Sequence, residues 1–297
     1  MAFATFLVHV EPDSTADPRL VLAVDLANQF DAMLIGVGAE TYGALSLGEG
    51  YAAEIVIGDV EANLRRAEEK FRAIAGTVRQ GTQWRSAMQF PVAEIANESR
   101  AADLVITGHS NHGGATSYTV GAPGPLIMET GRPVLAVPPD ANKLTVANVV
   151  VAWKDTREAR RAVSDALPFL QAARQVLVVE IIESTSSIPA TRGHLTEVSD
   201  HLRRHGIGAT VMIVAEAKVG SAAEQLLDIA EQQNADLIVA GGYGHGRLQE
   251  WVFGGFNPGT AHTDHQGCPV QSLMNCAVPR VQTHSEPEGN GGGERHG

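Results

Sequence analysis

Short apolar runs alternate along this chain with longer segments whose apolar residues recur every three or four positions. Residues 3–10 and 32–37 are almost continuously apolar, as strands buried on both faces are. Residues 18–30 instead place Leu20, Val24 and Ala27 on one side of a helix. Strands that alternate with helices at this spacing predict parallel sheets covered on both faces.

The pattern predicts five strands and four helices in the first half of the chain. The strands are expected at residues 3–10, 32–37, 82–88, 104–107 and 132–138. The helices are expected at residues 18–30, 60–74, 91–101 and 125–129, with a glycine-rich loop over residues 39–58. Asp59 stands just before the second helix, where an aspartate is a favourable cap.

The same pattern then restarts after a polar segment with a double proline, residues 138–143, which is interpreted as a linker. Further strands are expected at residues 148–153, 176–182, 209–214, 237–240 and 269–274, and helices at residues 157–172, 192–205 and 221–233. The fold class is therefore α/β, with two doubly wound five-stranded parallel-sheet domains in tandem, over residues 1–140 and 141–276. Residues 277–297 are polar and glycine-rich, and are expected to be disordered.

Composition limits the partners of such a protein. The 297 residues carry a net charge of −12, with an acidic excess in both halves, which argues against nonspecific binding to nucleic acid or anionic membrane. No apolar run approaches the roughly 20 residues of a membrane span. Two cysteines, Cys268 and Cys276, make no disulfide framework, which favours a cytoplasmic location. The N-terminus lacks the basic region of a signal peptide and is expected to be a first strand.

Two related glycine-rich segments, residues 102–122 and 235–255, each follow a predicted strand. In doubly wound sheets, ligands bind beyond the carboxyl ends of the strands, where the strand order reverses. The loops after Trp153 and Ala240 are therefore expected to meet at one site, and the loops after Val10 and Thr107 at a second.

Three stretches carry a resemblance to a known family: Arg132-Pro-Val-Leu-Ala-Val-Pro-Pro, Val150-Val-Ala-Trp-Lys-Asp-Thr-Arg, and Asp236-Leu-Ile-Val-Ala-Gly-Gly-Tyr-Gly-His-Gly. Up to about residue 275 the chain resembles tandem universal stress proteins. The resemblance implies a five-stranded Rossmann-like sheet per domain, a cytoplasmic location and roles in tolerance of stress. It also implies an intrachain pseudo-dimer of the two domains or a homodimer, and in some members a bound ATP.

Members of the family that bind ATP carry a glycine, two residues, a glycine, nine residues, a glycine and then serine or threonine. Gly241, Gly244 and Gly254 have this spacing, while Gly255 stands where the hydroxyl is expected. Such glycines let the backbone approach the ligand, so that successive N–H groups can hold a phosphate. The missing hydroxyl removes a hydrogen bond of about 1.5–3 kcal/mol. Downstream, Pro258 interrupts the helix that the family has there.

In the first half Gly108 and Gly121 fit the same spacing, but Asn111 and Ala122 replace the other two positions. Members that bind ATP also carry an aspartate just after the first strand, and the matching positions are Glu11 and Lys154. The first half thus keeps the acid and the second half the glycines. The resemblance implies a site for ATP, with Mg²⁺, in the second domain, formed by Gly241, Gly242, Gly244, His245, Gly246, Gly254, Gly255, Lys154 and Asp155.

Several other combinations of residues have simpler interpretations than a catalytic or metal site. No histidine cluster has the four ligands and the spacing of a structural zinc site, so solvated histidines are favoured and no metal site is predicted. Ser110 follows a strand as the nucleophile of a hydrolase does, but the motif lacks its last glycine. Trp153, Trp251 and Phe253 are interpreted as packing residues. The clusters of potential metal ligands are His262, Asp264, His265 and Cys268; His109 and His112; and His201 and His205.

Taken together, these features predict a universal stress protein that acts by binding and signalling, not as an enzyme. The predicted ligand is an adenine nucleotide in the second domain. Two alternatives stay open: a nucleotide-free interaction protein with two degenerate sites, and a slow ATPase that uses the same loop, for which no catalytic residue is evident.

Overall fold

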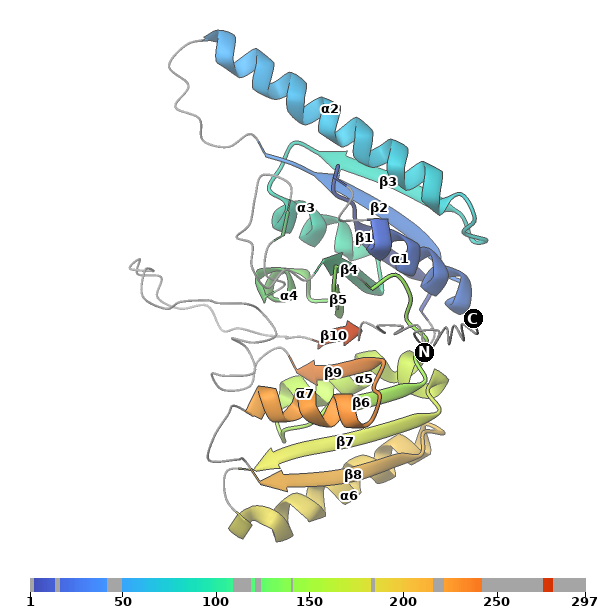
Figure 1. The fold of residues 1–297 in the computed structure, drawn as a ribbon, viewed down its shortest axis with the longest axis vertical. Helices are drawn as coiled ribbons and strands as arrows, with labels where there is room; N and C mark the ends of the chain where they lie inside the picture. The colour runs from blue at the N-terminus through green and yellow to red at the C-terminus, as the bar shows by residue number, and fades with distance from the viewer. Residues whose placement is uncertain are drawn as a thin grey trace, which may run out of the picture.

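The computed structural model describes residues 3–13, 17–41, 50–108, 119–120, 124–139, 141–182, 185–215, 222–241 and 275–279. These residues form one ten-stranded sheet with the strand order β3-β2-β1-β4-β5-β10-β9-β6-β7-β8. Figure 1 shows the sheet edge to edge, with β3 at one end, β8 at the other and helices on both faces.

The first half contributes the five parallel strands that its sequence predicts. They are β1 (Thr5–His9), β2 (Met33–Ala39), β3 (Thr82–Ala87), β4 (Leu104–Gly108) and β5 (Val134–Val137). The helices are α1 (Asp17–Phe30), α2 (Gly50–Ala75), α3 (Pro91–Glu98), the 3-10 turn η2 (Ser99–Ala101) and α4 (Gly124–Thr130).

Helix α2 corrects one prediction. It begins at Gly50, so Asp59 lies inside the helix and does not cap it, and the second part of the predicted loop is helical. Gly58 weakens the helical pattern of the sequence, which is why a loop is predicted up to this residue. A glycine inside a helix costs only about 1 kcal/mol relative to alanine, which the good helix formers around it can offset.

The second half contributes four parallel strands, β6 (Asn148–Ala152), β7 (Gln175–Ile182), β8 (Ala209–Ala215) and β9 (Leu237–Gly241). Its helices are α5 (Arg157–Ala172), η3 (Thr185–Ser187), α6 (Ile188–Arg204) and α7 (Ala222–Gln232). The predicted fifth strand, residues 269–274, lies outside the described residues.

Strand β10 (Asn275–Pro279) follows the predicted fifth strand in sequence, but it is not a fifth parallel strand of the second half. It lies between β5 and β9, parallel to the first and antiparallel to the second. The two predicted parallel sheets therefore contain five and four strands and are joined into one sheet through β10. The predicted tail, residues 277–297, begins inside this strand, and the remainder of it lies outside the described residues.

An aspartate at the start of the fourth strand fixes the strand register in each half. The Asp103 carboxylate accepts hydrogen bonds from the backbone N–H groups of Ala4 and Thr5, at 2.8 and 3.0 Å. The Asp236 carboxylate accepts the same pair from Ala147 and Asn148, both at 2.8 Å. The two halves thus share the register of their central strands. Counting from these bonds makes Glu11 equivalent to Lys154, and Gly108 equivalent to Gly241.

The two halves also share a hydrophobic core on one face of the sheet, beneath α1, α2, α5 and α6. Aromatic rings connect them. Phe169 of α5 packs on Phe3 and Phe30 with ring centroids 5.0 and 5.3 Å apart, and Phe6 completes the cluster. Separate clusters on the opposite face lie beneath α3 and α4 in the first half and α7 in the second. Burial of several aromatic rings at this join makes it a substantial source of stability.

None of the helices described in the structure is long and apolar enough to cross a membrane.

Candidate functional site

The strand order reverses once in each half, and each reversal opens a position for a ligand. From β1 the chain moves outward to β2 and β3, and then returns to β4 on the other side of β1. From β6 it moves to β7 and β8, and returns to β9. Ligands of doubly wound sheets bind beyond the carboxyl ends of the two strands at such a reversal. The candidate sites are therefore the β1–β4 edge and the β6–β9 edge.

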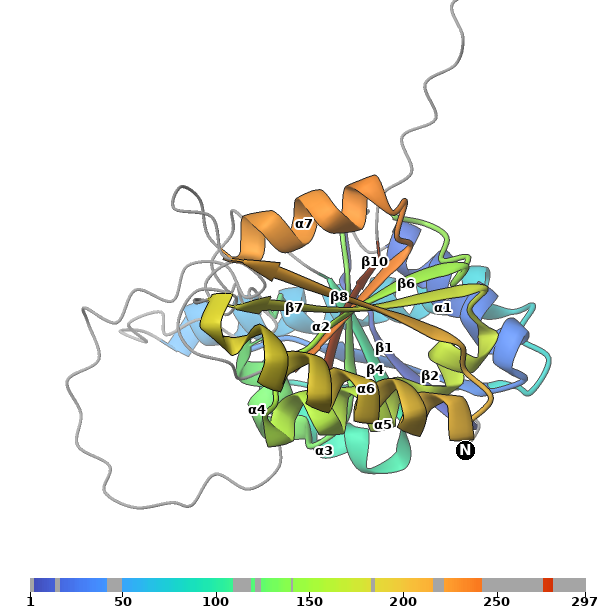
Figure 2. The ribbon, with the colours of Figure 1, turned by 90° about the horizontal axis from the view of Figure 1, so that it is seen from below.

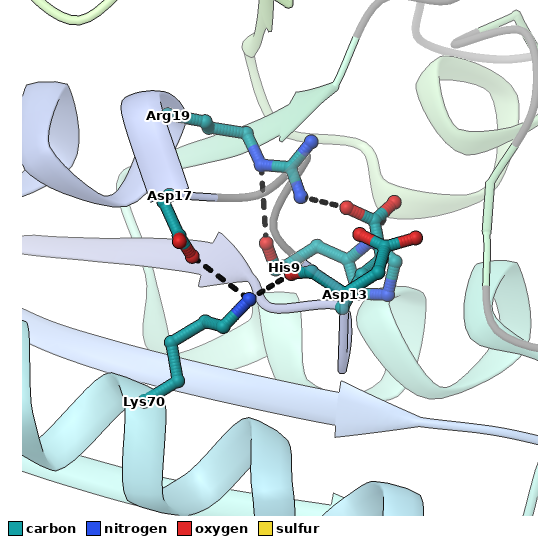
Figure 3. A network of polar contacts seen from close by, with 6 residues as sticks. His9, Asp13, Asp17, Arg19 and Lys70 are labelled. Atoms are coloured by element: carbon teal, nitrogen blue, oxygen red, sulfur yellow. Dashed lines mark hydrogen bonds and ion pairs between the residues drawn. The ribbon is translucent and has the colours of Figure 1, made fainter.

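At the β1–β4 edge, the side chain of Arg19 occupies the space between the strand ends (Figure 3). Arg19 stands in the first turn of α1, and its Nε–H donates to the backbone carbonyl of His9 at 3.2 Å. A second guanidinium nitrogen is paired with the Glu11 carboxylate. The third lies so close to Gly108 that a Cβ there would clash with it. Arg19 and Glu11 are both buried, so the acid of the first half is already satisfied within the chain.

The charge state of Glu11 follows from this pairing. Burial by itself would raise the pKa of the Glu11 carboxyl, but the Arg19 guanidinium, with a contribution from His9, holds that pKa below its ordinary value. The His9 Nδ1 lies 3.6 Å from the Glu11 carboxylate. Since the folded-state pKa is lowered, ionised Glu11 contributes stability above its unfolded pKa, and this contribution is lost as pH falls through the folded pKa.

Further charges surround the same edge and connect it to α2. The Lys70 ammonium of α2 lies 2.8 Å from the Asp17 carboxylate and donates to the Asp13 carbonyl. Figure 3 shows Lys70 and Asp17 beside Arg19 at the start of α1. The β1–β4 edge is therefore a network of internal ion pairs that ties α1 and α2 to the end of β1.

The β6–β9 edge has a different character. Ala152 lies directly beside Ala240 in the sheet, so the segment that begins at Trp153 emerges next to Gly241. Lys154 is exposed at this edge, in the place where Glu11 is buried in the first half. Asp155 is paired with Arg160 at 2.8 Å, with both side chains about half exposed.

Helix α5 begins at the same edge. The Thr156 hydroxyl caps it by accepting a hydrogen bond from the Ala159 N–H at 3.3 Å. Its first turn holds Arg157, paired with the buried carboxylate of Glu158 at 2.5 Å. The hydrogen bonds that Glu158 receives hold the pKa of its carboxyl below the ordinary value, although burial alone would raise it. The helix start and the exposed Lys154 are features that attract an anion, although the carboxylates of Asp155 and Glu158, each paired with an arginine, stand beside them.

Gly241 is required at the end of β9 because the start of α5 packs directly on it. A Cβ at this position would lie 2.8 Å from the Ala159 backbone nitrogen and 2.8 Å from the Glu158 carbonyl carbon. At Gly108 the obstructing atom is the end of a long side chain, whereas here it is backbone, which cannot turn aside. The first glycine of the predicted motif is thus needed for packing, whatever the loop binds.

We expect Gly241→Ala to lower the free energy of unfolding by about 1–3 kcal/mol, because the added methyl group must displace α5. Gly208→Ala is the control. A Cβ at Gly208 would have no neighbour within 4 Å, and a surface change of this kind alters stability by no more than about 0.5 kcal/mol. Urea unfolding of both variants measures the difference, and equal stabilities would contradict the close approach of α5 to β9.

The remaining predicted site residues, Gly242, Gly244, His245, Gly246, Gly254 and Gly255, lie outside the described residues. So do Ser110, His109, His112, Trp251, Phe253 and the residues from His262 to Cys268. His201 and His205 pack their rings edge to face, with centroids 4.8 Å apart. Trp153 is buried in the core, as predicted.

Arg19 is the residue of the β1–β4 edge that the sequence pattern does not point out. Its signal was its position, because Arg19 stands four and seven residues before Ala23 and Leu26, on the buried side of α1. A charged residue on the apolar side of a helix needs a charged partner. Glu11, just upstream, was the available carboxylate.

Known proteins resemble this chain in sequence over much of its second half and in structure over most of its length. Residues 145–257 match the model of the universal stress protein family. A universal stress protein from Archaeoglobus fulgidus DSM 4304 has a similar structure, with a TM-score of 0.61 at 15% identity over 93% of this chain and 96% of that one. A search of curated proteins finds no significant sequence match.

Two more distant structures also align with the chain. A functionally unknown protein from Pseudomonas aeruginosa PAO1 aligns over 94% of this chain and 92% of its own, at 14% identity and a TM-score of 0.49. A universal stress protein in complex with cAMP covers 46% of this chain and 98% of its own, at 18% identity and a TM-score of 0.33.

Proposed function

We propose that the protein binds one adenine nucleotide per chain, at the β6–β9 edge, since residues 145–257 match the model of the universal stress protein family. The ligand would be ATP with Mg²⁺ or a related adenine nucleotide. Binding would act through conformation or partner contact in stress tolerance, without turnover.

The observation that carries the proposal is the contrast between equivalent residues of the two halves. At the β1–β4 edge the acid, Glu11, is buried and paired with Arg19. At the β6–β9 edge Lys154 is exposed and stands beside Gly241, where the glycine spacing begins. An anionic ligand is attracted by an exposed lysine and a helix N-terminus, whereas a buried neutral ion pair offers it no charge. These features support a nucleotide in the second half alone.

The described residues of the second site fit the phosphate end of a nucleotide better than the base. Lys154 has donors only, and so can contact a phosphate or a ring nitrogen but cannot accept from the adenine amino group. The neighbouring Asp155 carboxylate could accept such a hydrogen bond, although it already accepts one from the Arg160 guanidinium. Gly242, Gly244, His245, Gly246, Gly254 and Gly255 would add backbone N–H groups around the phosphates.

Calorimetric titration with ATP and Mg²⁺ tests the proposal. We expect one site per chain, and expect Gly244→Val with Gly254→Val to remove the heat because their side chains would exclude the ligand from the backbone. The matched control is Gly121→Val in the first glycine segment, which should bind as the wild type does. A titration without heat, together with no nucleotide released from the denatured protein, would refute the nucleotide.

A second candidate function is that of an interaction protein whose two halves form an intrachain pseudo-dimer. The aromatic cluster that joins Phe169 to Phe3 and Phe30 supports this pairing. In that case the protein, which we propose to be cytoplasmic whichever function it has, would present a surface to a protein partner with both sites empty. A slow ATPase is the third alternative, and it requires turnover that the Gly244→Val and Gly254→Val substitutions abolish.

A further inference from the structure

Two exposed histidines lie one turn apart at the end of α6, away from the candidate nucleotide site. His201 stands in the last turn of the helix, and His205 is the residue that ends it. Because α6 leads into β8, this end of the helix lies at the amino ends of the parallel strands β7 and β8. The β6–β9 edge lies at the carboxyl ends. Figure 2 views the molecule from the β8 end, with α6 on one side of β8 and α7 on the other.

The imidazole rings of the two histidines are in contact. Their centroids are 4.8 Å apart and their planes are inclined at 66°, as side chains four residues apart on one side of a helix allow. Within the described part of the chain, no hydrogen bond or ion pair engages either ring. His194 of the same helix differs, because its Nε2 lies 2.6 Å from the Glu180 carboxylate. The ring nitrogens of His201 and His205 are therefore available to a ligand.

The separation of the two rings matches that of two imidazoles bound to one metal ion. A metal–nitrogen bond of about 2.0–2.1 Å places the ion about 3.2 Å from each ring centroid. Ligands at tetrahedral or square-planar angles, about 109° or 90°, then have centroids about 5.2 or 4.5 Å apart. The observed 4.8 Å lies between these values. Both histidines can thus reach one ion by rotation of their side chains, without a shift of the backbone.

The helix end that carries the pair is firmly held. The Ile207 N–H donates to the Leu202 carbonyl at 3.0 Å, and both residues are buried. Gly206, between them, has the positive φ typical of a glycine that ends a helix. Gln171 of α5 donates to the His205 carbonyl at 3.1 Å. A backbone fixed in this way lowers the entropy lost when both side chains bind one ion.

The charges around the pair favour a cation on balance. A helix carries partial negative charge at its carboxyl end, and Glu197, one turn before His201, is exposed on the same side of α6. Arg203 is paired with Asp200, which leaves Arg204 as the opposing charge of the last turn. Arg204 is exposed, so water and salt screen its effect.

We propose that His201 and His205 form an exposed site for a divalent transition-metal ion, which binds Cu²⁺ more tightly than Ni²⁺ or Zn²⁺. Imidazole suits these ions, and the order follows their general affinity for nitrogen ligands. The described residues contain no group of three or more potential ligands, so the pair supplies two ligands and water the others. A closed structural zinc site, by contrast, needs four protein ligands. Mg²⁺ prefers oxygen ligands and should not bind to the pair.

Calorimetric titration of the full chain with Cu²⁺ tests the site. His201→Asn and, separately, His205→Asn are each expected to weaken binding at this site by at least about tenfold, since one imidazole remains. The matched control combines Arg203→His with His205→Asn. It keeps the number of histidines but sets the two on different sides of the helix, and should bind as weakly as His205→Asn does. A Cu²⁺ titration that the single variants leave unchanged, or that the control reproduces, would overturn the proposal.

Nuclear magnetic resonance locates the bound ion. Substoichiometric Cu²⁺ is paramagnetic and should broaden the ring C–H signals of His201 and His205 before those of the other histidines, with the two asparagine variants giving the assignment. An excess of Zn²⁺ should remove the broadening by competition, whereas Mg²⁺ should not. Broadening that begins at other histidines and leaves these two rings unaffected would show that the ion binds elsewhere, and the proposal would then be wrong.

Discussion

Arg19→Met is expected to lower the free energy of unfolding by about 3–5 kcal/mol at neutral pH, because it leaves the buried carboxylate of Glu11 without its partner. Methionine keeps much of the volume of the side chain, so the loss reports the charge and not a cavity. The double variant Arg19→Met with Glu11→Leu removes both charges. It should recover most of the loss, since a buried ion pair can be replaced by apolar groups at little cost.

The pH dependence of this effect has a definite sign. In the wild type the pKa of Glu11 is lowered by Arg19 against the effect of burial. Without Arg19, the effect of burial is opposed mainly by His9, and we expect the pKa of Glu11 to rise above the unfolded value. The variant then loses stability as pH rises above the unfolded pKa, and regains it as pH falls and Glu11 takes up a proton. The difference between variant and wild type should therefore shrink in acid.

Urea unfolding at a series of pH values measures this difference. The control is Arg79→Met, because Arg79 is paired with Asp31 at 3.8 Å while both side chains are mostly exposed. A surface pair of this kind contributes at most about 1 kcal/mol. A loss in Arg19→Met that is no larger than the control, or that does not change with pH, would contradict the assignment of Arg19 and Glu11 as a buried ion pair.

Phe169→Ala is expected to cost about 3–5 kcal/mol and to uncouple the two halves of the chain. Phe169 is 1% exposed and is the residue through which α5 contacts Phe3 and Phe30. Truncation leaves a cavity at the join, where no other ring of the second half takes part in the described aromatic contacts. Each half should then unfold independently of the other.

Tryptophan fluorescence distinguishes this uncoupling from a simple loss of stability. Trp84 reports on the first half and Trp153 on the second, in chains where Trp251 and the other tryptophan are replaced by phenylalanine. In the wild type the two midpoints should coincide, as one cooperative transition requires. In Phe169→Ala they should separate. The ring of Phe71 packs on Trp84 far from the join, so Phe71→Ala serves as the matched core truncation. Because the halves stay coupled in this variant, the midpoint read with Trp153 should fall together with that of the first half, and it would keep its wild-type value only if the halves were independent. Coincident midpoints of Trp84 and Trp153 in Phe169→Ala would contradict the role of Phe169 in coupling the halves.

Much of the fold could be predicted because its causes are local. Runs such as β1 and β6 are buried on both faces, so they are continuously apolar, and the helices between them show one-sided spacing. The start of α2 could not be predicted, since Gly58 weakens the helical signal while its neighbours sustain the helix. The place of β10 between β5 and β9 depends on pairing with strands distant in sequence, which no local pattern records.

The candidate site divides in the same way. The spacing of Gly241 within its segment and the equivalence of Glu11 and Lys154 follow from the sequence, because each position is counted from a strand end. The engagement of Glu11 by Arg19 depends on how α1 packs across the end of β1, and on the close approach of Arg19 to Gly108. Sequence spacing predicted an available acceptor in the first half, and the side-chain packing showed that acceptor to be in use.

Native mass spectrometry of freshly purified, full-length protein tests the central claim most directly, because it counts nucleotides per chain. The account predicts one adenine nucleotide per chain, retained in Gly121→Val and lost in the combined Gly244→Val and Gly254→Val variant. Two nucleotides per chain would show that the Arg19–Glu11 pair does not close the first site. A chain that never carries a nucleotide, even after incubation with ATP and Mg²⁺, would contradict the claim itself.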